Sequence, residues 1–451
     1  MSPLFPPQSL EPFQRLQVND GLLITADRWR QAHTYHRQRQ NVHYQALNRG
    51  GIVWGLGVCA IAPPPEVADE YRDRRWLQIQ PGLAIDGNGN PIIVPEPMTF
   101  RIASAPPEQG LQFVYLSIRY VDPDGLQGQS NRELVAETFR LEETATPPQG
   151  TQVELCRILL QPGEVKLETA LNVLAPGVNQ LDLRDRPTAR PRSPLDIKVA
   201  LLAQGVAPER TQIIGARFSA LFRSLSALYP SMEGVALVPV HLEQLRSLAP
   251  DLLYLTYSQC LSLMPAQQDL LQQYLATGAA ALVEISAQEA KIADFSTVKV
   301  QLDAAIANLS PKPEFTDIGQ ELKDERAAME TLIQQQIYDL CRPIQVMAQR
   351  MGMPNETPLP SAHPLRNEPF LFDRLPAIER CPIHLQGWGG IVFSIGSISQ
   401  AWGIEAPFST SRETIRAAQE LGINLLHFAW RRHYLTQLQQ NDAPSSAQTA
   451  V

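Results

Sequence analysis

The sequence predicts a multidomain α+β protein, in which a β-rich region with one long helix precedes an α/β domain. The chain has 451 residues, which is more than one ordinary domain needs. Short strand-like runs separated by turn residues fill the first part, residues 1–183, and such a pattern is typical of a β-sandwich or barrel. From residue 195 onward strand-like and helical runs alternate, which favours a doubly wound parallel sheet.

The long helix of the first region is predicted from residue 25 to residue 48. Thr25 is suited to cap its start, and Asp27 in its first turn is favoured by the helix dipole. Six side chains recur at 4-3-4-3-4 spacing and share one helix face: Trp29, His33, His36, Gln40, His43 and Leu47. That face is only half apolar, so it suits a polar protein interface better than a core. We expect four of its residues to contact a partner: Trp29, His33, His36 and His43.

The histidines of this face could instead present imidazoles to a metal ion. Zinc usually takes a fourth ligand and a fixed second shell, and no nearby cysteine or carboxylate completes the set. Cys381 and His384 form one half of a metal clip, and the sequence supplies no second half. The sequence therefore predicts no metal and no cofactor.

Strands of the first region are predicted at 52–61, 76–79, 91–94, 113–120 and 153–160. In the fourth of these strands, Val114, Leu116 and Ile118 should share one face. Residues 184–194, RDRPTARPRSP, follow the strands and contain three prolines and four arginines. We interpret them as a stiff, solvated linker between domains, and the alternative is that their arginines touch an acidic partner.

The α/β domain is predicted over residues 195–287 and 361–435. Its strands are expected at 197–202, 235–240, 252–257, 280–285, 391–395 and 423–429. Its helices are expected at 208–228, 265–276 and 411–421. This alternation predicts a parallel sheet with helices on both faces.

Residues 288–360 are predicted to form a helical hairpin inserted into the α/β domain. Its second helix carries an apolar heptad stripe, and Pro343 should kink or interrupt that helix. The stripe either packs on its own domain or forms an arm that binds a partner. Under the second interpretation the contact residues are Ile333, Ile337, Leu340 and Met347. The tail, residues 436–451, is small and polar and is expected to be disordered.

A doubly wound domain invites a search for catalytic chemistry. The sequence holds neither a dinucleotide-binding or triphosphate-binding glycine loop nor a nucleophile elbow. Cys260 follows a predicted strand, but its neighbours include no glycine for a tight turn. It is the one candidate nucleophile, with His241, His363, His384 or His427 as its base, and a buried inert thiol is the alternative. The sequence therefore favours a protein that is not an enzyme.

Charge and composition narrow the class of partner and compartment. The net charge is −8, and no basic stripe occurs beyond the short arginine-rich segment, so nucleic acid is not expected as a partner. The five cysteines are scattered and are expected to be unpaired, mostly buried thiols of a reducing compartment. Neither a signal peptide nor a membrane span is apparent, so we expect a cytoplasmic protein that reaches a membrane only through partners.

The first region resembles the N-terminal region of proteins encoded with phage-tail-like contractile injection systems. Four pieces carry the resemblance in the same order: residues 20–27 (DGLLITAD), 35–37 (YHR), 51–56 (GIVWGL) and 81–87 (PGLAIDG). The chain departs from the family pattern at Trp29, where phenylalanine is commoner, and at Trp54. The resemblance implies a structural protein of the baseplate.

The second region, from residue 195 to residue 430, resembles an uncharacterised bacterial domain whose sheet is similar to class I glutamine amidotransferases. The matching pieces are 251–256, 271–284, 363–365 and 421–426. Amidotransferases use a glycine-flanked cysteine and a later His-x-Glu, whereas His241 and Glu243 precede Cys260 here. The resemblance thus implies the fold and argues against the activity. The pairing of the two regions is similar to the cyanobacterial type of injection system, some of which are anchored at thylakoid membranes.

These observations predict a non-catalytic structural subunit at or near a baseplate. Its expected partners are other baseplate and sheath proteins, arranged in multiple copies in a symmetric assembly. Two alternatives stay open: a divergent amidotransferase-fold enzyme that uses Cys260, and a small-molecule sensor that uses the crevice at the carboxyl ends of the strands.

Overall fold

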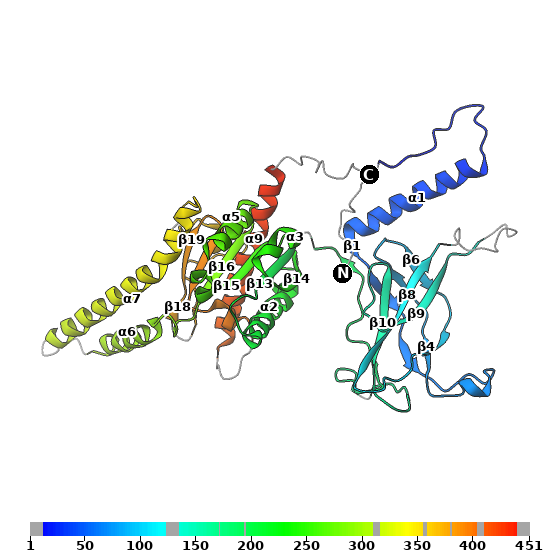
Figure 1. The fold of residues 1–451 in the computed structure, drawn as a ribbon, viewed down its shortest axis with the longest axis horizontal. Helices are drawn as coiled ribbons and strands as arrows, with labels where there is room; N and C mark the ends of the chain where they lie inside the picture. Colours follow the sequence, from blue (N-terminus) through cyan, green and yellow to red (C-terminus); the bar gives the residue numbers. More distant parts are fainter. Residues whose placement is uncertain are drawn as a thin grey trace. The chain divides into compact units, whose positions relative to one another are not determined.

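A computed structural model describes residues 12–122, 135–170, 172–193, 195–309, 316–354, 359–378, 381–403 and 410–439. The chain divides into two compact units, Met1–Arg192 and Ser193–Val451. The first unit holds β-sheets and one long helix, and the second holds a mixed sheet with helices (Figure 1). The predicted α+β class is confirmed at this level, and the boundary between the units falls inside the predicted linker.

Helix α1 (Ala26–Leu47) has the predicted bounds. The Thr25 hydroxyl accepts a hydrogen bond from the Arg28 backbone N–H at 3.3 Å, which satisfies one of the free donors at the helix start. Asn48 adopts an extended backbone that ends the helix, and β1 (Asn48–Arg49) follows directly.

The sheets of the first unit share one hydrophobic core. Two three-stranded sheets have the orders β2-β5-β6 and β3-β4-β7, and a four-stranded sheet has the order β11-β10-β8-β9. The bounds are β2 (Gly51–Gly55), β3 (Val58–Ala60), β4 (Trp76–Ile79), β5 (Gly82–Ile85), β6 (Pro91–Val94), β7 (Met98–Arg101), β8 (Gln112–Val121), β9 (Thr138–Thr144), β10 (Gln152–Leu160) and β11 (Leu181–Asp182). A 3-10 turn, η1 (Asp69–Tyr71), precedes β4.

The predicted strand 52–61 is instead two strands in different sheets, β2 and β3. Gly55 and Leu56 both have positive φ, 68° and 53°, and this conformation breaks the extended chain between the strands. The predicted face of β8 is confirmed, because Val114, Leu116 and Ile118 all lie in the core. Strands β1, β5, β7, β9 and β11 were not predicted.

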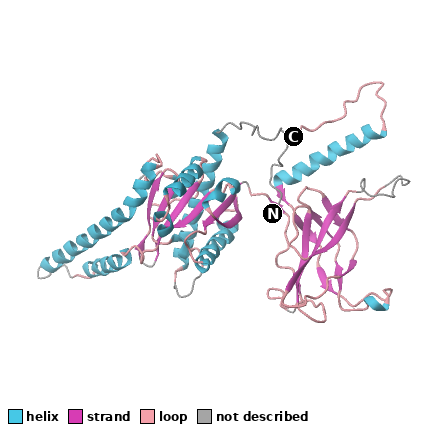
Figure 2. Cartoon of the chain, viewed as in Figure 1, coloured by secondary structure: helices cyan, strands magenta, loops and turns pink. Residues whose placement is uncertain are grey.

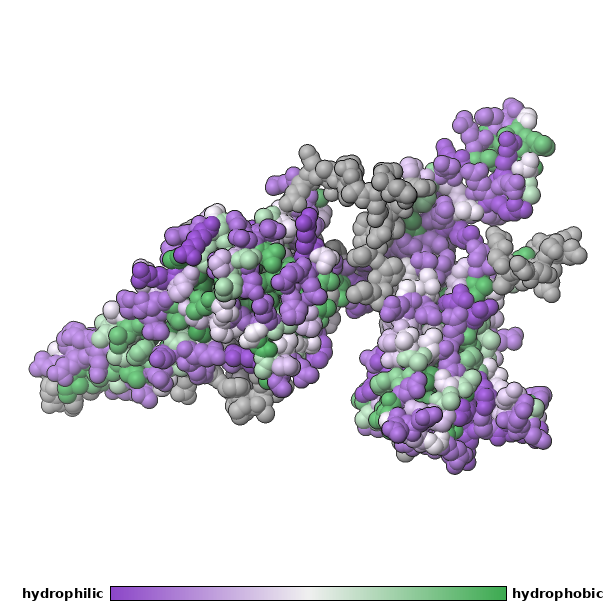
Figure 3. Space-filling model, in the orientation of Figure 1, coloured by the Kyte–Doolittle hydropathy of each residue, from purple (hydrophilic) through white to green (hydrophobic). Residues whose placement is uncertain are grey.

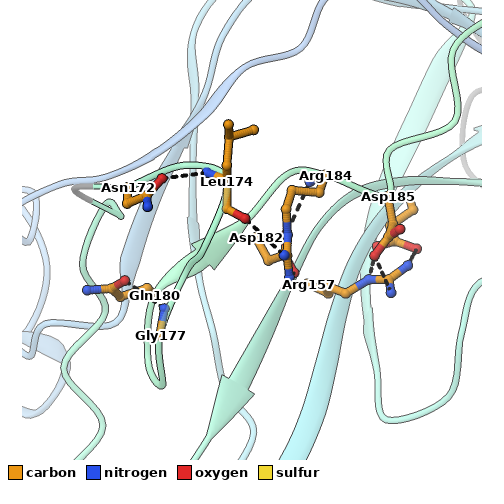
Figure 4. Close-up of polar contacts among 9 residues, drawn as sticks. Arg157, Asn172, Leu174, Gly177, Gln180, Asp182, Arg184 and Asp185 are labelled. Atoms are coloured by element: carbon orange, nitrogen blue, oxygen red, sulfur yellow. Dashed lines mark hydrogen bonds and ion pairs between the residues drawn. The ribbon is translucent and has the colours of Figure 1, made fainter. Parts of the chain in front are cut away.

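The proline- and arginine-rich segment before the boundary is bound to the first unit and is not a free linker. Strand β12 (Arg190–Pro191) pairs with β1, and the Ile52 backbone N–H donates to the Pro187 carbonyl at 2.8 Å. Arg184 forms an ion pair with Asp182, and Asp185 forms one with Arg157 at 2.7 Å (Figure 4). The sequence did not predict this backbone pairing, because each proline of the segment lacks the N–H group that strand pairing normally uses.

The second unit is built on a six-stranded sheet of order β14-β13-β15-β16-β20-β19. Neighbouring strands are parallel except for the last pair, β20 and β19, which is antiparallel. The bounds are β13 (Leu195–Leu202), β14 (Met232–Val240), β15 (Leu252–Thr256), β16 (Ala280–Ile285), β19 (His384–Trp388) and β20 (Ile391–Ile395). Five of the six predicted strands are present, and β19 adds an edge strand that was not predicted.

Helices cover both faces of this sheet (Figure 2). Helices α2 (Pro208–Leu228) and α9 (Arg412–Gln439) pack on one face. The other face carries α5 (Pro265–Ala276), α6 (Ile292–Ala307) and α7 (Thr316–Arg350). Short elements complete the unit: η3 (Leu242–Gln244), α3 (Leu245–Leu248), α4 (Tyr257–Leu261), α8 (Pro364–Asn367), β17 (Ala377–Ile378), β18 (Cys381–Pro382) and η5 (Ile398–Ala401).

One strand prediction for the second unit is wrong, and of the two effects predicted for Pro343, a kink or an interruption, the interruption does not occur. Residues 423–429 are not a strand, because they belong to the single helix α9, which ends at Gln439. This part of α9 is buried nearly all round, and a buried helix resembles a buried strand in sequence. Pro343 does not interrupt the second hairpin helix, since α7 continues through it between the buried Cys341 and Ile344. The predicted disordered tail starts too early, because residues 436–439 belong to α9, and residues 440–451 lie outside the described residues.

Candidate functional site

The predicted contact face of α1 is exposed along its whole length. None of the 22 residues of α1 is buried. The six side chains of the predicted face are all exposed: Trp29, His33, His36, Gln40, His43 and Leu47. The Trp29 ring lies edge-on to the His33 ring, with 5.3 Å between centroids. The predicted grouping on one face is thus present, and no other element among the described residues buries that face.

The opposite face of α1 lies on the turn between β5 and β6. Gln45 donates a side-chain hydrogen bond to the Asn88 carbonyl, and Asn41 contacts Asn90. Arg37 forms a 3.1 Å ion pair with Asp122 at the end of β8. Asp86 holds the turn itself, because its carboxylate accepts hydrogen bonds from the Asn88 and Asn90 backbone N–H groups at 2.9 and 2.8 Å. These contacts anchor the C-terminal half of α1.

An extended arm precedes α1 and adds apolar surface to it. The Phe13 ring meets the Tyr35 ring edge-on at 6.5 Å, so the arm runs back along the helix. Four of its apolar side chains are exposed: Phe13, Val18, Leu23 and Ile24. Hydrophobic atoms gather where the arm turns into α1 (Figure 3). The arm and the exposed helix face together form what we call the α1 surface: residues 13–24 with Trp29, His33, His36, Gln40, His43 and Leu47.

The contact residues predicted in the hairpin lie elsewhere. Ile333, Ile337 and Met347 are buried in the core beneath the sheet, and Leu340 packs against that core. This placement corresponds to the alternative in which the apolar stripe packs on its own domain. The four side chains are thus not available as a contact surface, since the sheet of their own unit already covers them.

Cys260 lacks the environment of a nucleophile. It lies in α4 with only 1% of its surface exposed, and burial raises the pKa of its thiol to about 12. Catalytic cysteines have lowered pKa values and partial exposure, so a buried thiol of this kind is inert near neutral pH. Two of the candidate bases have other roles: His363 caps α8, and His427 packs edge-on against Tyr229.

A crevice opens in the second unit at the carboxyl ends of the strands. Its cavity measures about 450 Å³ and is bordered by residues that follow β13, β16 and β20. The lining residues are Ala207, Glu209, Arg210, Ile213, Ile214, Arg217, Tyr254, Glu284, Ser286, Glu289, Ser397 and Gln400. This edge of a parallel sheet is where open α/β folds bind ligands.

Glu284 lies at the base of this crevice and is 4% exposed. The Tyr254 hydroxyl donates to its carboxylate at 2.9 Å, and Ser399 donates through its backbone N–H at 3.0 Å and its hydroxyl at 2.6 Å. Burial raises the pKa of the Glu284 carboxyl above its ordinary value, and the hydrogen bonds from Ser399 and Tyr254 partly oppose that rise. Sequence reasoning missed this residue, although a charged side chain near the end of a buried strand is a signal for such a site.

Within the described residues, no three histidine, cysteine, aspartate or glutamate side chains are grouped so that they could hold a metal ion. The helices among those residues include none that is long and apolar enough to cross a membrane. In comparisons with known proteins, no protein-family model and no curated protein matches the chain. Two features of the described residues remain as candidate functional sites, the α1 surface and the crevice of the second unit.

Proposed function

We propose that the protein is a non-catalytic structural subunit of a contractile injection system, at or near the baseplate, and that it binds its neighbours through the α1 surface. The observation that carries the proposal is the exposure of α1. A helix of 22 residues has no buried side chain, yet it displays an exposed tryptophan and three exposed histidines on one face.

The physical argument concerns how such a helix stays folded. Helices in proteins obtain most of their stability from packing one face against other elements. Among the described residues, polar contacts with the β5–β6 turn and with Asp122 anchor the C-terminal half of α1. Aromatic side chains exposed near apolar neighbours mark protein contact sites. A partner that covers Trp29 and the arm would bury the apolar surface that the described part of the chain leaves exposed.

The charge of α1 indicates the chemistry of that partner. The helix carries four arginines and one aspartate, which gives 4 − 1 = +3, whereas the whole chain carries −8. Arg37 already pairs with Asp122 of the same unit. The complementary surface is therefore an acidic protein surface with an apolar pocket for Trp29.

The assignment to an injection system rests on the sequence resemblance of residues 20–87, which includes α1 itself. Under this proposal the neighbours are baseplate and sheath proteins, in several copies around a symmetry axis. The protein lies in the cytoplasm and reaches a thylakoid membrane only as part of an anchored particle.

The proposal is tested by affinity purification of the tagged full-length protein from its native cell, followed by mass spectrometry and negative-stain imaging. We expect sheath, tube and baseplate proteins on contractile particles. The same purification is repeated with Trp29→Ala and with Trp54→Ala, a matched control on β2 whose tryptophan is as exposed, at 59% against 56%. Trp29→Ala should lose the partners, and Trp54→Ala should keep them. A small oligomer with no tail-like partners would overturn the proposal.

The alternative of a divergent amidotransferase-fold enzyme has less support, because Cys260 is buried and its thiol pKa is raised. The alternative of a small-molecule-binding domain is favoured by one observation, the crevice above Glu284. Binding there is compatible with a structural role, since the crevice and the α1 surface lie in different units.

A further inference from the structure

The crevice of the second unit has the size and the walls of a ligand site. Its cavity of about 450 Å³ falls within the range of roughly 300–1,000 Å³ that is usual for small-molecule pockets. One wall is apolar and is formed by Ala207, Ile213 and Ile214. A bare inorganic ion would leave most of this space empty, so the fit is to an organic molecule with a carbon skeleton.

Helix α2 brings two arginines to the crevice. Arg210 and Arg217 both line the cavity and lie about two turns apart on the same helix, so they share a face. Ala207 precedes the helix and provides no side-chain cap, and Pro208 and the acidic Glu209 occupy the first turn. The first backbone N–H groups of a helix with no cap and the positive end of its dipole favour an anion at this place.

Three carboxylates also line the crevice, Glu209, Glu284 and Glu289, so an incoming anion competes with them for the two arginines. The Glu284 carboxylate already accepts three hydrogen bonds from Tyr254 and Ser399. Glu289 forms a 3.1 Å ion pair with Arg210, and both partners are about half exposed. Exposed pairs of this kind contribute little stability, so a ligand oxyanion can replace Glu289 beside Arg210 at low cost. Arg217 is oriented by a 3.3 Å hydrogen bond to the Ser399 hydroxyl.

We propose that this crevice binds a small organic anion, whose carboxylate or phosphate group is held by Arg210, Arg217 and the start of α2, and whose carbon skeleton lies against Ile213 and Ile214. Guanidinium groups pair with both kinds of oxyanion through two parallel hydrogen bonds. Ser286, Ser397 and Gln400 supply further polar groups for the rest of the molecule. The inference goes beyond the structural role proposed above and does not depend on it.

The test uses the purified full-length protein and measures binding by calorimetry and by the shift of the thermal unfolding midpoint. The probes are glycerol 3-phosphate and succinate, which represent the two oxyanions, and glycerol serves as the uncharged control. We expect saturable binding of at least one anionic probe and none of glycerol. Arg217→Gln and Arg210→Gln should each weaken that binding by about tenfold or more, because a charge-assisted pair is lost.

Arg223→Gln is the matched control, because Arg223 is an exposed arginine of α2 that does not line the cavity. It removes the same charge from the same helix and should leave the affinity unchanged. Arg210 is also exposed, so its replacement leaves the fold intact even if Arg217→Gln proves unstable. Which probe binds distinguishes a phosphate ligand from a carboxylate ligand. The proposal would be overturned if all three variants bound the probe with the same affinity as the parent protein. It would also be overturned if neither probe showed saturable binding.

Discussion

Gly89 lies directly against the backbone of Asn41, where α1 rests on the turn between β5 and β6. A methyl group added at Gly89 would come within 2.5 Å of the Asn41 carbonyl oxygen, which is closer than real Cβ contacts allow. Gly89 also has a φ of +82°, a conformation that other residues adopt only with strain. This one glycine therefore permits the anchored half of α1 to approach its own unit.

Gly89→Ala should loosen α1 from the first unit. The expected cost is about 1–3 kcal/mol, from backbone strain together with the clash against Asn41. Hydrogen exchange should rise in the backbone amides of residues 41–47. Gly110→Ala is the control, because Gly110 has a similar φ of +75° and nothing within 4 Å of its added methyl. Unchanged exchange in α1 of Gly89→Ala would show that the turn does not anchor the helix.

Ile337→Ala should destabilise the second unit by about 2–4 kcal/mol, because it opens a cavity beneath the sheet. Ile318→Ala is the control, because Ile318 lies on the same helix but is 47% exposed. Its replacement should lower the free energy of unfolding by less than about 0.5 kcal/mol. Chemical unfolding of both variants measures the difference. If both variants unfold like the parent chain, the apolar stripe of α7 is free to bind a partner after all.

The buried Glu284 should make stability depend on pH in the direction opposite to that of an ordinary ion-paired carboxylate. Because burial raises its pKa in the folded state, its stabilising contribution is present at pH values below the unfolded pKa. That contribution is lost as the pH rises through the higher folded pKa. Glu284→Gln should remove this part of the pH dependence, as unfolding measured from about pH 4 to about pH 8 would show. Identical pH profiles for both proteins would contradict it.

Alkylation should separate the five cysteines by burial. Cys59 is partly exposed, whereas Cys156, Cys260, Cys341 and Cys381 are buried. Burial raises the thiol pKa of Cys260 to about 12, so iodoacetamide at neutral pH should modify Cys59 far faster, as peptide mass spectrometry would show. Rapid modification of Cys260 in the folded protein would contradict its burial and would make it a candidate nucleophile again.

Several elements could be predicted to the residue because the chain marks their ends. Helices α2 and α5 begin at Pro208 and Pro265, and proline is suited to the first turn of a helix. Gly278 follows α5 with a φ of +92°, and only a glycine fits there beside Thr436. A different local signal marks the start of α1, where the Thr25 side chain caps the helix.

The crevice could not be predicted because its parts are far apart in the sequence. Glu284 and Ser399 are 115 residues apart, and only the pairing of β16 with β20 brings them together. Arg217 reaches the same place from α2, whose sequence shows an ordinary amphipathic helix. Residues 423–429 failed for a different reason, since burial on every side removed the helical periodicity that marks a surface helix.

The central claim, that the exposed face of α1 binds another protein, is tested most directly by photo-crosslinking in the native cell. A crosslinking amino acid is placed at His36, on the exposed face, and in a second strain at Asn41, which faces the β5–β6 turn. We predict that His36 captures a different protein of the particle and that Asn41 reacts mainly within its own chain. Crosslinks from His36 that stay within the chain, with no second protein captured, would contradict the claim.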